Sequence, residues 1–125
     1  MIDIEGFQQT LGELRESVQK SSDALRLPQL SEELTELKEE MNSPEFWGDL
    51  ERSTTVNRRV SQIEEKVNHV NSLHARMDDV EAMLMLLNEE ADEEIGAECE
   101  TELNALQKDA DALELETLMR GEYDS

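Results

Sequence analysis

The fold is decided by one uninterrupted stretch, residues 49–88, which reads DLERSTTVNRRVSQIEEKVNHVNSLHARMDDVEAMLMLLN. This stretch contains no proline, and its apolar residues recur at steps of three and four. They are Val56, Val60, Ile63, Val67, Val70, Leu73, Met77, Val80, Leu84 and Leu87. Such spacing places them along one face of an α-helix. Forty residues predict a helix roughly 60 Å long, because each residue adds about 1.5 Å.

Apolar residues with the same helical spacing also occur in the sequence before and after the long helix; we call each such set an apolar stripe. They predict further helices over about residues 3–26, 28–42 and 93–120. Leu27-Pro28 separates the first two, because proline disfavours helical geometry at the residue before it.

The two long helices are separated by a predicted turn over residues 88–92. Asp92 is a suitable N-cap for the last helix, and Gly121 is a suitable residue just past its end. No alternation typical of strands competes with these patterns. The sequence therefore predicts a single all-α domain over residues 1–125. The expected architecture is an elongated antiparallel bundle of about four helices, dominated by a long helical hairpin.

The charge balance excludes whole classes of partner. The chain has 32 acidic and 11 basic residues, for a formal net charge of −21. A nucleic-acid-binding protein needs clustered Lys and Arg, so no direct nucleic-acid binding is expected. Anionic membrane surfaces are excluded for the same reason, and no apolar run is long enough to span a bilayer. We expect a soluble cytoplasmic protein.

Candidate chemistry is sparse. His69 and His74 are five residues apart rather than the four that would align two metal ligands on one helical face. Cys99 lies within an apolar stripe beside Glu98 and Glu100, which would oppose formation of a thiolate. We therefore expect no metal site, no cofactor and no catalytic residue. Met83 and Met85, beside Leu84, Leu86 and Leu87, are expected to pack in the core at the end of the hairpin, and the alternative is a soft binding surface.

Two segments interrupt the helical pattern. Residues 43–49 (SPEFWGD) form a predicted connection that holds two of the four aromatic residues, Phe46 and Trp47. Because exposing both rings would be costly, we expect them to act as structural anchors that plug the junction. The second segment is residues 120–125 (RGEYDS), at the predicted end of the last helix.

These two segments carry a resemblance to a known family. With Leu34, Leu37 and Met41 before them, residues 43–47 (SPEFW) and 119–124 (MRGEYD) resemble the N-terminal domain of bacterial peptide chain release factor 2. This is a family of class-I translation termination factors. Asp49 and the pair Leu113-Glu114 belong to the same pattern, and the order and spacing of the predicted helices agree along essentially the whole chain.

The resemblance implies a helical domain that precedes the decoding and catalytic domains. The Gly-Gly-Gln tripeptide with which the family promotes peptidyl-tRNA hydrolysis is absent, and so is its Ser-Pro-Phe decoding element. The chain thus looks like an excised domain that is not itself an enzyme.

The resemblance also implies the partners. The family's N-terminal domain is associated with the ribosome, at the stalk base around protein L11, and with release factor 3. An acidic surface suits basic ribosomal proteins. We expect the contact at the predicted turn, through Asn88, Glu89 and Asp92. The alternative is a free-standing acidic helical adaptor or a coiled-coil dimer.

Overall fold

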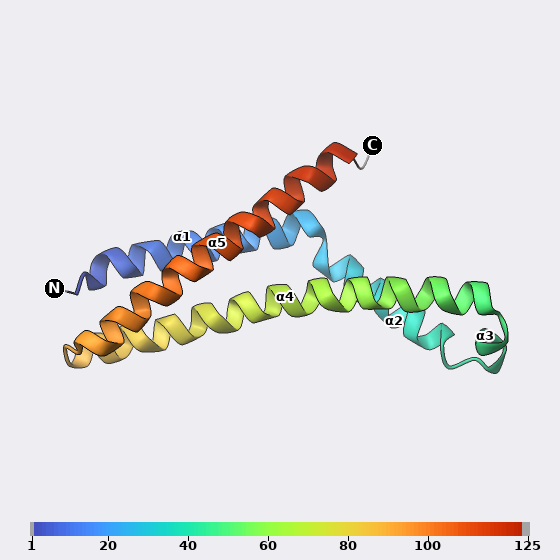
Figure 1. Cartoon of the computed structure of the whole chain (residues 1–125), viewed down its shortest axis with the longest axis horizontal. Helices are drawn as coiled ribbons and strands as arrows, with labels where there is room; N and C mark the ends of the chain where they lie inside the picture. The colour runs from blue at the N-terminus through green and yellow to red at the C-terminus, as the bar shows by residue number, and fades with distance from the viewer. Residues whose placement is uncertain (1, 124–125) are drawn as a thin grey trace. The chain divides into compact units, whose positions relative to one another are not determined.

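The computed structural model describes residues 2–123 of the chain, and the side chains of residues 2–119. Over this part the chain forms five α-helices and no strand, which confirms the predicted all-α fold (Figure 1). The helices are α1 (Ile4–Leu25), α2 (Leu27–Glu40), α3 (Pro44–Gly48), α4 (Leu50–Glu89) and α5 (Glu93–Tyr123). Among these residues, none of the helices combines the length and the apolar character needed to cross a membrane.

The helices are divided between two compact units. Unit 1 consists of residues 1–25 and 71–125, and unit 2 of residues 26–70. The 40-residue helix α4 contributes its first half to unit 2 and its second half to unit 1.

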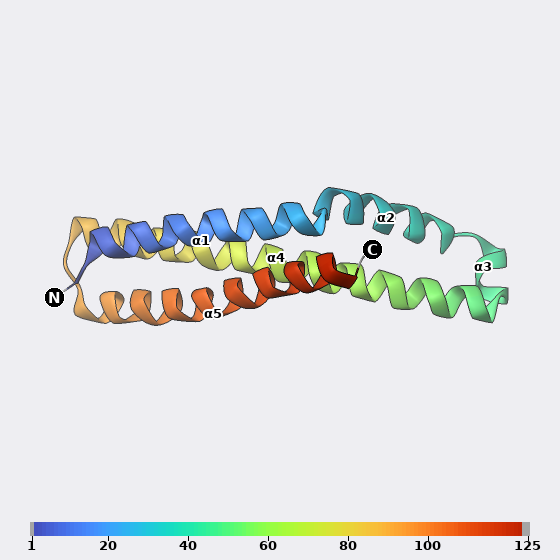
Figure 2. The same ribbon diagram turned by 90° about the horizontal axis from the view of Figure 1, so that it is seen from above.

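Unit 1 packs α1, the second half of α4, and α5 together. α1 and α5 run in the same direction, whereas α4 runs against both (Figure 2). Of the predicted apolar stripes, these members are buried: Leu11, Leu14, Val18 and Leu25 on α1, Leu73, Met77, Val80, Leu84 and Leu87 on α4, and Cys99, Leu103, Leu106, Ala110 and Leu113 on α5. Farther along α5, the side chain of Leu118 is exposed.

The N-terminal ends of α1 and α5 lie close together in unit 1. A Cβ added at Gly96 would lie only 2.9 Å from Cγ1 of Ile2, so the absence of a side chain there permits the contact. Asp3 caps α1, since its Oδ1 accepts a hydrogen bond of 3.0 Å from the backbone N–H of Gly6.

Unit 2 packs α2 and α3 against the first half of α4. Its core contains buried Phe46, Val56 and Val60, surrounded by the partly buried apolar side chains of Leu34, Leu37 and Met41. Three ion pairs join α2 to α4: Glu33 to Arg59 at 2.6 Å, Lys38 to Glu64 at 2.9 Å, and Glu40 to Arg52 at 2.6 Å.

The helix boundaries differ from the predicted ones in three places. The break between the first two helices falls at Arg26, whose backbone is left-handed (φ 56°, ψ 52°), so Pro28 lies in the first turn of α2. The predicted connection over residues 43–49 contains a one-turn helix, α3. α5 does not end before Gly121 as predicted but continues through it to Tyr123. A glycine ends a helix only where the backbone leaves the helical path at that residue.

Candidate interaction surfaces

The negative charge of the chain is concentrated in unit 1. Residues 1–25 and 71–125 carry 22 acidic and 5 basic residues, a net charge of −17, whereas residues 26–70 carry 10 and 6, a net charge of −4. Any partner that is attracted by charge will therefore be drawn mainly to unit 1.

Two arginines of unit 1 form ion pairs between its helices. Arg15 on α1 lies 3.0 Å from both Asp78 and Glu81 on α4. Arg76 on α4 contacts Glu102 and Asp109 on α5, each at 2.7 Å. The hydrogen bonds that Arg76 donates to Asp109 and Glu102 raise the pKa of its guanidinium, so it stays charged. Each arginine thus links its own helix to a neighbouring one by pairing with two carboxylates of that neighbour.

A turn lies between α4 and α5 as predicted, but it begins after Glu89, so Asn88 and Glu89 belong to the last turn of α4. Oδ1 of Asp92 accepts backbone hydrogen bonds from Glu94 at 3.0 Å and Ile95 at 3.2 Å, which confirms its role as the N-cap of α5. Asn88, Glu89 and Asp92 are all exposed. The structure therefore assigns Asp92 a structural role, and leaves its proposed partner contact as a prediction.

Next to this turn lies a groove between α1 and α4, which we call the α1–α4 groove. It has a volume of about 300 Å³ and is lined partly by Asn88, Met85 and Leu11. Met85 is 65% exposed and its neighbour Leu86 is 53% exposed. The expectation that Met85 packs in the core is wrong, because Leu84 and Leu87 occupy the buried face of α4 at that point.

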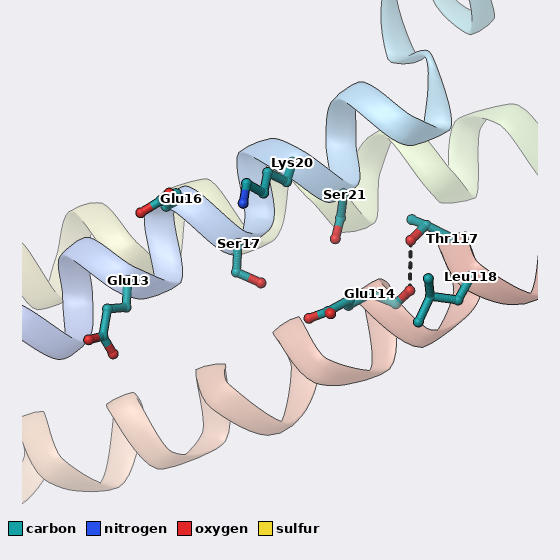
Figure 3. A pocket seen from close by; sticks show the side chains of 8 residues that line it. All are labelled: Glu13, Glu16, Ser17, Lys20, Ser21, Glu114, Thr117 and Leu118. Atoms are coloured by element: carbon teal, nitrogen blue, oxygen red, sulfur yellow. Dashed lines mark hydrogen bonds between the residues drawn. The ribbon is translucent and has the colours of Figure 1, made fainter.

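A second groove of unit 1, the α1–α5 groove, lies between the C-terminal parts of α1 and α5 and has a volume of about 400 Å³ (Figure 3). Ser17 and Ser21 point from α1 toward α5, where Glu114, Thr117 and Leu118 lie opposite them. Sequence reasoning missed this groove, because the residues that face each other across it are about 100 positions apart in the chain.

Unit 2 contains the two predicted aromatic anchors. Phe46 is buried, but Trp47 is 58% exposed, so the expectation that both rings are covered is wrong for Trp47. Consecutive residues of a helix point about 100° apart, and α3 can direct only one of them into the core. Trp47 is nevertheless held in place: its indole N–H donates to the carbonyl of Met41 at 3.0 Å, and its ring packs edge-on against Phe46.

The residues with potential for metal or thiol chemistry are not brought together. His69 is exposed, His74 is half-buried, and Cys99 is fully buried. Burial raises the pKa of the Cys99 thiol, which favours its neutral form. Among the described side chains, those of residues 2–119, no three His, Cys, Asp or Glu residues are placed to hold a metal ion.

The profile of the PCRF domain family matches residues 30–125 of this chain. The chain belongs to this family. The PCRF match begins in α2 and includes α3, α4 and α5, whereas α1 precedes it. The α1–α5 groove is therefore formed by one helix of the PCRF match and one helix that lies before it.

Several curated relatives align with almost the whole chain, including the residues that precede the PCRF match. The chain is 32% identical to peptide chain release factor 2 of Clostridium perfringens over 124 residues, which are 99% of this chain and 34% of that protein. It is 34% identical to peptide chain release factor 2 of Kineococcus radiotolerans over 119 residues, 95% of this chain and 32% of that protein. The corresponding protein of Streptomyces avermitilis is 30% identical over 125 residues, 100% of this chain and 33% of that protein. The chain thus spans about a third of the length of the curated relatives that it matches.

Proposed function

We propose that this chain takes part in stop-codon-directed translation termination on the ribosome, as a docking module without catalytic activity. The observation that carries the proposal is the PCRF match over residues 30–125, together with relatives named peptide chain release factor 2 that align over almost the entire chain. Termination takes place in the cytoplasm, which we propose as the location.

The charge of unit 1 supports a basic protein as the direct partner. A net charge of −17 repels RNA phosphates and attracts Lys-rich and Arg-rich protein surfaces. We propose the stalk base of the ribosome around protein L11 as the docking site, with release factor 3 as a second partner in the same process.

The contact is proposed to include the turn between α4 and α5 and the α1–α4 groove beside it. Asn88 and Glu89 provide exposed polar groups there, and Met85 and Leu86 provide exposed apolar surface. Apolar side chains that a partner can cover, surrounded by charged groups, are typical of the centre and rim of a protein interface.

The test is co-sedimentation of the purified chain with purified bacterial ribosomes over a range of salt concentrations. We expect binding at low salt that weakens as salt rises, because the attraction is screened. A Met85→Ala, Leu86→Ala double variant should bind less well. The matched control is Leu50→Ala, which removes an 80% exposed apolar side chain in unit 2. Absence of co-sedimentation at low salt would contradict docking, and equal losses in both variants would contradict the contact at the turn.

A further inference from the structure

The α1–α5 groove has the composition of a binding site for a hydrogen-bond donor. Its lining includes three glutamates, Glu13, Glu16 and Glu114, but only one basic residue, Lys20. The rest of the lining consists of three hydroxyl side chains and the apolar Leu118. A cationic group that enters this groove therefore meets an excess of acceptors.

Ser21 shows that the groove contains a polar group that is still without a partner. The residue is only 3% exposed, and its hydroxyl points into the groove (Figure 3). No hydrogen bond joins this hydroxyl to any other residue in the described part of the chain. The hydroxyl oxygen is not one of the fully buried unpaired atoms of the described residues, so it is accessible from the groove and can bond a ligand that enters it.

The hydroxyl of Thr117 can accept, but not donate, a hydrogen bond on the side of the groove. Its hydroxyl donates its single hydrogen to the backbone carbonyl of Glu114 at 2.7 Å, which leaves the oxygen lone pairs free to accept (Figure 3). The carboxylate of Glu114 adds two acceptor oxygens on the same side of the groove. Acceptors on α5 thus face the Ser21 hydroxyl on α1.

We propose that the α1–α5 groove binds an arginine side chain from a basic segment of the protein partner. A guanidinium has five N–H donors in a planar fork and can bond acceptors on both helices at once, whereas a lysine ammonium is a compact point charge. Leu118 can cover the aliphatic part of the arginine side chain. Leu115 and Met119, which are 57% and 48% exposed, offer apolar surface on the same turns of α5 to the rest of the segment. This inference rests on the proposed docking function and specifies the chemistry of the partner.

The test uses a fluorescently labelled amphipathic peptide of alternating arginines and leucines, titrated with the full chain and followed by anisotropy. A second peptide carries lysine in place of every arginine. We expect tighter binding of the arginine peptide. Glu114→Gln should weaken that binding about tenfold, which corresponds to about 1.4 kcal/mol, because it replaces a charged acceptor by a neutral one. Ser21→Ala should weaken it in the same direction.

The matched control is Glu100→Gln, which removes the same charge from an exposed position of α5 outside the groove. It should change the affinity less than twofold, roughly the effect expected from a distant screened charge. Equal losses in Glu114→Gln and Glu100→Gln would overturn the proposal, because they would show general attraction to an acidic surface. Equal affinity for the two peptides would also overturn it. Since Glu114 is exposed, its variant remains informative if Ser21→Ala fails to fold.

Ribosome co-sedimentation of the same variants separates this proposal from the docking function. If the unmodified chain does not sediment with ribosomes, the docking function fails, and the peptide titration still decides whether the groove binds arginine. If the unmodified chain sediments and Glu114→Gln sediments less than Glu100→Gln, both are supported. Equal sedimentation of these two variants, despite a selective loss of peptide binding, would overturn the role of the groove in docking.

Discussion

Arg26 is the one non-glycine residue with a positive φ among the described residues. Its φ of 56° places a residue with a Cβ in the left-handed region, which costs about 1–2 kcal/mol relative to ordinary helical geometry. The side chain makes no capping hydrogen bond that would offset this cost.

We predict that Arg26→Gly raises the free energy of unfolding by up to about 1 kcal/mol, because glycine adopts this conformation without strain but gains more freedom in the unfolded chain. Chemical denaturation followed by circular dichroism measures the change. Arg26→Ala is the control, since alanine keeps the strain. A glycine variant less stable than the alanine variant would contradict the account.

Phe46 and Trp47 are adjacent aromatic residues with different environments. We predict that Phe46→Ala lowers the free energy of unfolding by about 3–5 kcal/mol, because it leaves a cavity in the core of unit 2. Trp47→Phe should cost less than about 1 kcal/mol, since the larger part of the ring already lies in water. Denaturation curves of the two variants test the difference. Similar losses would show that Trp47 is as much a structural anchor as Phe46.

At the scale of helices, three ion pairs supplement the apolar contact that Leu34 and Leu37 of α2 make with the core formed in part by α4. Only Leu30 is buried on α2, yet Glu33, Lys38 and Glu40 all reach basic or acidic partners on α4. The hydrogen bond from Arg59 lowers the pKa of Glu33 below its ordinary value of 4.5, although partial burial opposes the shift. The contribution of this pair to stability is therefore fully present above that value, and it is lost as the pH falls through the lower pKa of the folded state.

We predict a coupling energy of about 0.5 kcal/mol between Glu33 and Arg59 near neutral pH, which is typical of a solvent-exposed pair. A double-mutant cycle with Glu33→Gln and Arg59→Met measures it, and a repeat at about pH 3 should give a smaller value. Glu36→Gln, at an exposed position of α2, is the control and should show no coupling to Arg59→Met. A coupling that grows toward acid pH would contradict the assignment.

At the scale of the whole molecule, the net charge of −21 opposes folding. The ion pairs of Arg15, Arg52, Arg59 and Arg76 offset only part of the repulsion, because 32 acidic residues face 11 basic ones. Repulsion among the remaining carboxylates is larger in the compact state than in the unfolded chain.

We predict that the thermal midpoint rises between about 10 mM and about 150 mM NaCl, because salt screens this repulsion. Circular dichroism melting curves measure the midpoint, and KCl should give the same increase if screening is the cause. A midpoint that falls over this range would show that the ion pairs between helices outweigh the repulsion.

Local regularities in the sequence were sufficient to predict α1, α2, α4 and α5, but not the one-turn helix α3. The steps of three and four in residues 49–88 identified α4 to within one residue at each end, and Asp92 identified the start of α5. The boundary at Arg26 was predicted one residue late, because proline restricts its predecessor but does not determine which residue turns left-handed. The charge of the chain and its short release-factor motifs could also be read directly from the residues.

The candidate surfaces depended on contacts between helices distant in the chain. Ser21 on α1 opens into the α1–α5 groove with its hydroxyl, and the exposed side chain of Leu118 on α5 also lines this groove. The sequence by itself determined the helices, the acidic charge and the family, because periodicity, charge and short motifs are local properties. Only the tertiary structure decided that α1 and α5 form a groove rich in acceptors and that Phe46 rather than Trp47 enters the core, because those outcomes depend on which helix faces approach each other.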